Sequence, residues 1–221
     1  MNNITVLYYT SNRENEKFEE KVRRNILKLK GDLPLISVSQ KPLNFGRNIC
    51  VGVQDNCYGN EFRQIQIGLK EVHTEYVLCA ESDVLYPPEY FQFEPTGADY
   101  YRYSNVWVHY ARPPKRKNEP QVVLFKRFSD GAQLLKTKFW SDLIDKNIGT
   151  GDHWFTTADI LPRFTLETIP GLVWGNDHPV ITYKTLSNVS RKTSLQKNHP
   201  PREELPYWGN IAKLNKRIFI R

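Results

Sequence analysis

The sequence lacks several features that would place it in a familiar class. Only three cysteines occur, Cys50, Cys57 and Cys79, and no two of them form a CxxC pair. No stretch stays apolar for the length that a membrane span needs, and the N-terminus has no basic region followed by an apolar signal core. These absences argue against secreted, disulfide-linked and membrane-spanning classes. We therefore expect a soluble cytoplasmic protein whose cysteines stay reduced and act as packing residues.

Two common nucleotide-binding sequences are also missing. Neither the dinucleotide-binding pattern GxGxxG nor the P-loop pattern GxxxxGK[ST] occurs, so the usual dehydrogenase and nucleoside-triphosphatase chemistries are not indicated. No internal repeat is evident. What is present is a chain of 221 residues, 39% hydrophobic and 13% aromatic, which suits one well-filled domain and argues against disorder.

The formal net charge of +7 is unevenly distributed along the chain. Residues 184–221 contain nine Lys or Arg and two acids, whereas the preceding residues contain 22 of each sign. Interleaved with Tyr207, Trp208 and Phe219, this basic segment suits a polyanion, through phosphate contacts and base stacking. A solvated tail, or one that binds an acidic or anionic-lipid surface, remains an alternative. We expect a domain over residues 1–190 and a basic C-terminal extension over 191–221.

Strands and helices alternate in the first half. Residues 4–9, 34–39 and 76–80 read as strands. A helix over 18–29 has Ser11 or Asn12 available as its cap and Gly31 as its stop, and Asn60 can cap a second helix. The pattern predicts an α/β fold, with a mixed, mainly parallel sheet flanked by helices in a single domain. Right-handed crossovers would then bring residues 10–12, 40–41 and 81–83 to one edge of the sheet.

The second half has a different pattern. We expect strands over 100–110 and 121–125, separated by the basic loop ARPPKRKNEP, and later a helix in the segment 129–147. The stretch GTGDHWF could open a short helix with Asp152 at its N-terminus, and two short strands would flank the turn 175–179. In the first half of the chain, the segment QKPLNFGRNICVG, residues 40–52, is predicted to be a loop.

The most informative stretch is YVLCAESDVLYPP, residues 76–88. A short apolar run without polar alternation predicts a strand buried on both faces, and it ends on two carboxylates, Glu81 and Asp83. Ligands of open α/β sheets gather at the carboxyl ends of strands, so this pair suggests a site for a hard divalent cation that carries phosphate oxygens. A loop or capping role for the two acids remains the alternative.

These features together resemble a GT-A-fold (Rossmann-like) glycosyltransferase. The likeness is carried by the strand and loop ITVLYYTSN, the helix NEFRQIQIGLKEV and the segment YVLCAESDVLYPPEYF. The form E-x-D-V-L-Y resembles the acidic metal motif of phage and bacterial enzymes that glycosylate hydroxymethylated pyrimidines in DNA. The likeness covers residues 4–190, with a nucleotide-sugar-binding half over 1–98 and an acceptor half over 99–190. For a phage enzyme, the location would be the host cytoplasm.

The resemblance implies a nucleotide-sugar donor, such as a UDP-sugar, and a cofactor ion, Mn²⁺ or Mg²⁺. The ion would lie on Asp83 with Glu81 beside it and would offset the charge of the departing nucleoside diphosphate. Related enzymes often add a late histidine; Thr185 stands at the matching position here, and His178 or His199 could substitute. The residues implied to bind the donor are Tyr9, Thr10, Ser11, Asn12, Lys41, Arg63, Gln64, Glu81 and Ser82.

An inverting transfer would also need a base to take the proton of the acceptor hydroxyl. By the resemblance, Asp152 is the first candidate and Asp177 the second, and Trp154 could stack on the sugar or on a flipped base. The implied acceptor is DNA, contacted by Lys115, Arg116, Lys117, Arg191, Lys192, Lys197 and Trp208. Two alternatives remain: a glycosyltransferase acting on a cell-surface or capsule glycan, and a nucleic-acid-binding module without enzyme activity.

Overall fold

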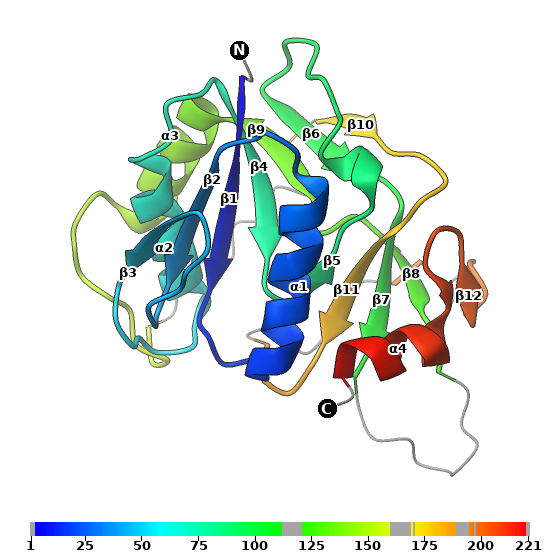
Figure 1. Cartoon of the computed structure of the whole chain (residues 1–221). Helices are drawn as coiled ribbons and strands as arrows, with labels where there is room; N and C mark the ends of the chain where they lie inside the picture. The colour runs from blue at the N-terminus through cyan, green and yellow to red at the C-terminus, as the bar shows by residue number, and fades with distance from the viewer. Residues whose placement is uncertain are drawn as a thin grey trace.

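The structure is a computed structural model, and it describes residues 3–111, 121–159, 169, 171–188, 195–196 and 198–219. Two sheets form its frame, a seven-stranded sheet in the order β10-β6-β9-β4-β1-β2-β3 and a four-stranded sheet in the order β5-β11-β7-β8 (Figure 1). The strands are β1 (Ile4–Thr10), β2 (Leu35–Ser39), β3 (Arg47–Cys50), β4 (Tyr76–Glu81), β5 (Val84–Leu85), β6 (Tyr100–Tyr103), β7 (Val106–Tyr110), β8 (Leu124–Arg127), β9 (Gln133–Lys136), β10 (Leu172–Trp174), β11 (Val180–Lys184), β12 (Glu204–Leu205) and β13 (Gly209–Asn210).

Four helices and one short 3₁₀ turn accompany the strands: α1 (Glu16–Leu29), α2 (Tyr58–Leu69), η1 (Pro88–Tyr90), α3 (Thr137–Ile148) and α4 (Ile211–Phe219). β1, β2, β3 and β4 are parallel, β9 is antiparallel to both β4 and β6, and β10 is parallel to β6. This confirms the prediction of a mixed, mainly parallel α/β sheet. In the described residues, no helix combines the length and apolarity needed to cross a membrane.

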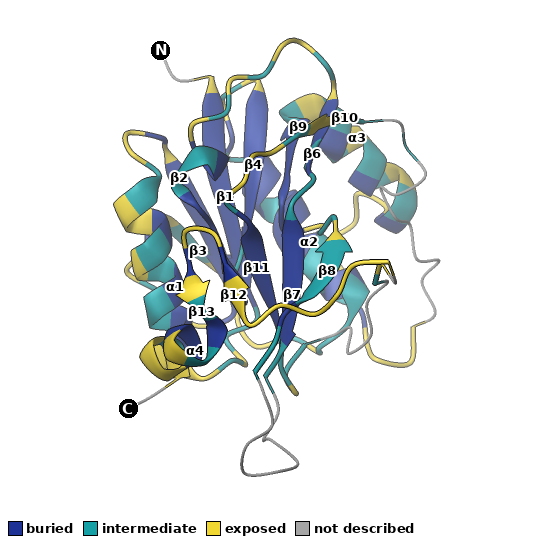
Figure 2. Cartoon of the chain, turned by 90° about the vertical axis from the view of Figure 1, so that its right-hand side faces the viewer, coloured by how far each residue is buried: buried dark blue, intermediate teal, exposed yellow. Residues whose placement is uncertain are grey.

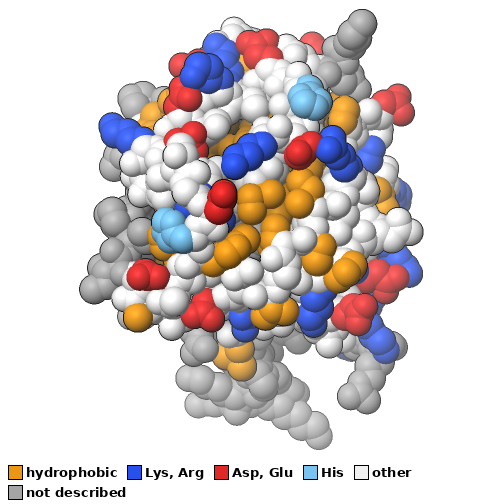
Figure 3. Space-filling view, turned by 90° about the vertical axis from the view of Figure 1, so that its left-hand side faces the viewer, with side chains coloured by type: hydrophobic (Ala, Val, Ile, Leu, Met, Phe, Trp, Pro, Cys, Tyr) orange, Lys and Arg blue, Asp and Glu red, His pale blue; other side chains and the backbone are white. Residues whose placement is uncertain are grey.

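The seven-stranded sheet lies between two layers of helices because its central strands are apolar on both faces. On β1, Val6 and Tyr8 pack in the core with α1, while Leu7 packs in the core with α2 and α3. Figure 2 shows the buried strands with α1 and α4 on one side and α2 and α3 on the other. Apolar side chains also gather on the side of the molecule that carries α2, α3 and β3 (Figure 3). Phe62 of α2 and Phe139 of α3 are only partly buried.

Several local predictions were wrong in instructive ways. The cap of α1 is Asn15, whose Oδ1 accepts from Phe18 N at 3.3 Å, and not Ser11 or Asn12. α2 begins at Tyr58, and the side chain of Asn60 instead bonds both backbone groups of Phe155, at 2.8 Å each. β3 falls within the expected loop.

The expected single strand over 100–110 is two strands in different sheets, β6 and β7, separated by Ser104 and Asn105. The chain crosses between the two sheets in the same way at 82–83, where β4 leads into β5. It crosses again at 128–132 and at 175–179. The acidic pair therefore lies at the boundary between the sheets, with Glu81 ending a strand of one and Asp83 leading into the other.

The C-terminal segment differs from a tail. Trp208, Ile211 and Leu214 are buried in the larger hydrophobic core, and α4 packs against α1. Arg202 also forms an antiparallel bridge to Val123. Residues 198–219 are thus part of the folded domain, because their apolar side chains alternate with the basic ones that face solvent.

Candidate functional site

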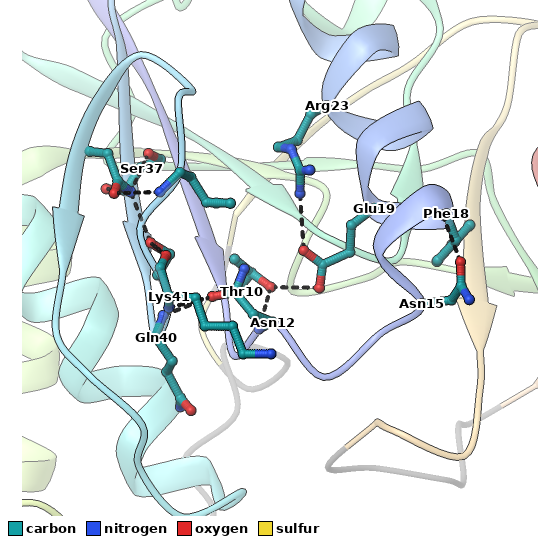
Figure 4. A network of polar contacts seen from close by, with 12 residues as sticks. Thr10, Asn12, Asn15, Phe18, Glu19, Arg23, Ser37, Gln40 and Lys41 are labelled. Atoms are coloured by element: carbon teal, nitrogen blue, oxygen red, sulfur yellow. Dashed lines mark hydrogen bonds and ion pairs between the residues drawn. The ribbon is translucent and has the colours of Figure 1, made fainter.

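Loops that follow three parallel strands meet at one edge of the large sheet, as the strand order predicted. Asn12 Oδ1, after β1, accepts hydrogen bonds from the backbone N–H groups of Gln40 and Lys41, after β2, at 2.9 Å each (Figure 4). Tyr9 Oη donates to Glu81 Oε1, at the end of β4, at 2.9 Å. The predicted neighbourhood of these loops is confirmed.

The loop that follows β1 is fixed by hydrogen bonds within the loop and to helix α1. Thr10 Oγ1 donates to Glu19 Oε1 of α1 at 3.0 Å and accepts from Asn12 N at 2.9 Å, and Arg23 pairs with Glu19 at 3.1 Å (Figure 4). Asn12 has the left-handed φ of 52°, which asparagine tolerates better than most residues. Thr10 and Asn12 therefore shape the loop, while Ser11 stays partly exposed.

Glu81 and Asp83 form a largely buried acidic pair, with Ser82 partly exposed between them. Burial above all, and next the charge of Asp83, raises the pKa of Glu81 well above its ordinary value. Burial also raises the pKa of Asp83, while Lys184 and a hydrogen bond from Asn188 oppose the rise. Two carboxylates kept close together in a dry setting are typical of functional sites.

Gly131 lets Glu81 occupy its position. A Cβ atom at residue 131 would lie 2.4 Å from Cδ of Glu81. Tyr86 fixes the same place, since its Oη donates to Gly131 O at 2.7 Å and accepts from Glu81 N at 2.9 Å. The turn 129–131 and the end of β4 are thus packed directly on each other.

The segment 185–188, which follows β11, contributes Asn188 and contacts Glu14, two residues that the sequence did not single out; Thr185 was noted only as the residue at the expected histidine position. Asn188 Nδ2 donates to Asp83 Oδ2 at 2.5 Å, and Thr185 Oγ1 donates to Glu14 Oε1 at 2.5 Å. Ser187 Oγ adds a bond to Arg13 O at 3.0 Å. Burial raises the pKa of Glu14 to about 7. No local pattern marks Asn188 or Glu14, because only the fold brings them to Asp83 and Thr185.

Arg63 is a buried residue of α2. It is 2% exposed between α2 and α3, with Nη1 3.4 Å from Gly149 O and Nη2 3.4 Å from Ile148 O, carbonyls at the end of α3. Its Nη1 also donates to Gln66 Oε1, so these hydrogen bonds are made within the α2 and α3 layer. Gln64 is closer to the site, since its Nε2 donates to Thr10 O at 2.9 Å and to Val38 O at 3.3 Å and so ties the ends of β1 and β2 together.

His178 does not join the acidic pair, which corrects its expected role as a metal ligand. Its Nδ1 lies 2.7 Å from Glu89 Oε1, and it precedes β11, whereas Lys184 at the other end of that strand is the residue beside Asp83. Asp177 belongs to the same distant turn. Asp152 is exposed near Arg63, and residues 150–159 form no helix there.

Trp208 is also placed away from a stacking surface. It is 9% exposed, and its Nε1 donates to Pro179 O at 2.6 Å, so its ring serves the core and not a base. The other expected nucleic-acid contacts, Lys115, Arg116, Lys117, Arg191, Lys192 and Lys197, lie outside the described residues. His199 packs its ring on Phe125, with centroids 4.2 Å apart.

The two carboxylates suit a divalent cation in kind. A cation would offset the burial and repulsion that raise the pKa of Glu81, and Mg²⁺ and Mn²⁺ prefer carboxylate oxygens. Within the described ranges, no group of three or more His, Cys, Asp or Glu is arranged to hold a metal ion. The remaining positions of such an ion would fall to water and to phosphate oxygens, as is usual for Mg²⁺.

Comparisons give similarities of fold. No protein-family model matches the chain, and no curated protein matches its sequence. Bifunctional IspDF of Campylobacter jejuni aligns with TM-score 0.45 and 14% identity over 78% of this chain and 49% of that one. S. aureus TarS 1-349 in complex with UDP-GlcNAc gives 0.42 and 13% over 63% and 47%. HddC of Yersinia pseudotuberculosis gives 0.41 and 13% over 78% and 89%. The chain spans about half the length of the first two structures.

Proposed function

We propose that this protein is a glycosyltransferase of the GT-A type that uses a nucleotide-sugar donor, such as a UDP-sugar. The observation that carries the proposal is the largely buried pair Glu81 and Asp83 at the carboxyl end of the central parallel strand, bonded to Tyr9 of β1 and to Asn188. In open α/β sheets this edge is where ligands bind, and a phosphate-bearing donor accounts for a paired acid there.

Each residue of the site has a part in this scheme. Asp83 and Glu81 would hold a Mg²⁺ or Mn²⁺ ion, which when bound supplies positive charge to the departing nucleoside diphosphate. Tyr9 and Asn188 keep the two carboxylates oriented through their hydrogen bonds. Ser11, Lys41 and Ser82 lie on the adjacent loops with exposed or partly exposed side chains, where a base or ribose would contact them.

We further propose that the acceptor is a hydroxymethylated pyrimidine in DNA and that transfer inverts the anomeric centre, with Asp152 as the base. Support comes from where the basic segments begin. Ala111 N donates to Lys184 O at 2.9 Å, so the sequence RPPKRKNEP continues from the edge of the site. The segment containing Arg191 and Lys192 continues from Asn188, which bonds Asp83. Two cationic stretches of sequence that begin beside the site suit a polyanionic acceptor.

Mass-detected sugar transfer tests this function. The protein is incubated with a panel of nucleotide sugars, Mn²⁺ or Mg²⁺, and duplex DNA with or without hydroxymethylated pyrimidines. Transfer that requires the hydroxymethyl group supports the proposal. Transfer only to glycan or lipid acceptors would retain the enzyme and change its acceptor. Salt-sensitive DNA binding without transfer or donor hydrolysis would identify a binding module instead.

Asp83→Asn is the informative variant in this assay. It should abolish transfer and weaken metal-dependent donor binding while leaving the melting temperature nearly unchanged, because asparagine keeps the shape of the side chain. Asp142→Asn is the matched control, since Asp142 is exposed on α3 and pairs there with the exposed Lys138. Full activity of Asp83→Asn would remove the metal role of the pair.

A further inference from the structure

Two lysines of the four-stranded sheet, Lys184 and Lys126, carry positive charges that act on Asp83 of the acidic pair. Lys184 ends β11, where Tyr183 N donates to Asp83 O at 2.8 Å and Thr182 pairs with Val84, so the strand runs directly alongside Asp83. Lys126 lies in β8, just before the turn 129–131 that packs on Glu81. Lys184 lies level with Tyr110, where β7 ends, and Lys126 lies near Val106, where β7 begins, so the two side chains come from opposite ends of this sheet. The charges of both ammonium groups act on Asp83.

The backbone at Lys126 is built to place this side chain. β7 and β8 pair Val106 with Arg127 and Trp107 with Phe125, which leaves Lys126 as the extra residue of a β-bulge. Arg127 has a φ of 76°, a left-handed value that a long side chain rarely adopts. Bulges and such strained residues gather next to functional sites, where they re-aim a side chain.

The described residues leave most hydrogen-bond donors of these two ammonium groups available to a ligand. Among the described residues, Lys126 Nζ has a single hydrogen-bond partner, Ser129 Oγ at 3.2 Å, and no ion pair within 4.0 Å is found for Lys126 or Lys184. Burial lowers the pKa of Lys126, while Asp130 and then the acidic pair oppose that effect. Burying an ammonium group without hydrogen-bond acceptors for most of its N–H donors raises the free energy of the folded state, and an anion that binds there would offset this cost.

The charge balance of the proposed reaction calls for such groups. A nucleoside diphosphate brings negative charge to a site that already holds two carboxylates, and lysine is a common phosphate-binding residue because it presents three donors around a point charge. We propose, on the basis of the proposed function, that Lys126 and Lys184 bind the diphosphate of the donor directly, so that nucleotide binding persists when divalent cations are removed.

Calorimetric titration with UDP in the presence of EDTA tests this inference, with CDP, GDP and ADP as further probes. Wild-type protein should bind at least one of them. Lys126→Met and Lys184→Met should each weaken that binding roughly tenfold or more, the effect expected for one charge-assisted hydrogen bond. Lys126→Arg should retain part of it. Lys138→Met is the control, since Lys138 is 85% exposed on α3 and should leave binding unchanged.

Two results would overturn the assignment. One is nucleotide binding to the wild type that appears only with Mn²⁺, and the other is equal affinity of wild type, Lys126→Met and Lys184→Met in EDTA. In both cases a nucleotide site exists, so the proposed function survives the loss of the lysine role. If no nucleoside diphosphate binds with or without Mn²⁺, the lysine assignment and the proposed function fail together. Melting temperatures of the variants identify any that do not fold, and Lys184→Met, in a partly exposed position, decides the question if Lys126→Met unfolds.

Discussion

Tyr9 Oη donates a 2.9 Å hydrogen bond to Glu81 Oε1 and so links the carboxyl ends of β1 and β4. Both residues lie on strands whose register pairs Tyr9 with Glu81 directly. The bond holds one carboxylate of the acidic pair in a fixed orientation. Burial separately raises the pKa of this Glu81 carboxyl group.

Tyr9→Phe should therefore weaken transfer more than it weakens the fold. Losing one hydrogen bond costs about 1 kcal/mol of unfolding free energy. The Glu81 carboxylate would no longer be held in the orientation for donor binding. The loss of kcat/KM, expressed as a free energy, should therefore exceed the loss of unfolding free energy. Denaturant titration and steady-state kinetics measure the two effects. Tyr110→Phe serves as control, because Tyr110 is partly exposed at the end of β7. Equal activity of Tyr9→Phe and wild type would show that the bond is only structural.

Gly131→Ala should displace Glu81. The added methyl would lie 2.4 Å from Cδ and Oε2 of that side chain, far inside normal contact, so the carboxylate must move away from Tyr9. We expect donor affinity to drop while the fold persists, since the moving group is the end of a flexible side chain. Gly68→Ala gives the contrast: its methyl would lie 2.5 Å from Leu7 Cδ1 in the core, and it should lower the melting temperature without selective loss of binding. The same ratio of binding loss to stability loss in both variants would refute this expectation.

Glu14 makes stability depend on pH. Burial raises its pKa from an ordinary 4.5 to about 7, so the folded state holds a proton that the unfolded state has released. The stabilisation from this proton is complete below pH 4.5 and is lost as pH rises through 7. Glu14→Gln should remove that part of the dependence, flattening the unfolding free energy between these limits. Chemical denaturation from about pH 4.5 to 8 measures it, with the exposed Glu94→Gln as control. Identical curves for Glu14→Gln and wild type would contradict the assignment.

The part that the basic segment 112–120 plays in DNA binding can be tested through the dependence of affinity on salt. Replacing Lys115, Arg116 and Lys117 with Gln should flatten the dependence of DNA affinity on salt, by roughly 0.9 in log–log slope for each phosphate that the protein no longer neutralises. Neutralising Lys70, Lys138 and Lys146, three exposed lysines of the α2 and α3 layer, is the charge-matched control. An unaltered slope in the first triple variant would exclude this loop from the DNA-binding surface. Deleting the C-terminus is unsuitable, because Trp208 and Leu214 belong to the core.

The sequence predicted the central strands and helices because each of them has a local pattern of apolar residues. The apolar run before Glu81 and the helical spacing of Phe18, Val22 and Ile26 correspond to β4 and α1. β3 escaped because RNIC is an edge strand with polar, exposed ends and no apolar alternation. The two strands within 100–110 were predicted as one strand, since the break between them falls at Ser104 and Asn105 and contains neither glycine nor proline.

The sequence predicted the acidic pair of the candidate site and the meeting of the loops after β1, β2 and β4. Glu81 and Asp83 stand together in the sequence at the end of an apolar strand, and that signal is local. Asn188 reaches Asp83 across 105 positions of the chain, and Lys126 is directed by a bulge that depends on pairing with β7. Arg63 and Trp208 have side chains of a kind that suits ligand contact, but tertiary packing, which leaves no local signal in the sequence, buries both of them.

The position of the acidic pair at the boundary between the two sheets has a mechanical consequence. Glu81 and Tyr9 belong to the seven-stranded sheet, whereas both lysines belong to the four-stranded one. Side chains of the two sheets pack in one hydrophobic core, so that core sets the spacing between the opposite charges. The crossing at Ser104 and Asn105 is joined to the crossing at 175–179 by hydrogen bonds to Trp174 O and Asn176 O, which adds a second connection between the sheets.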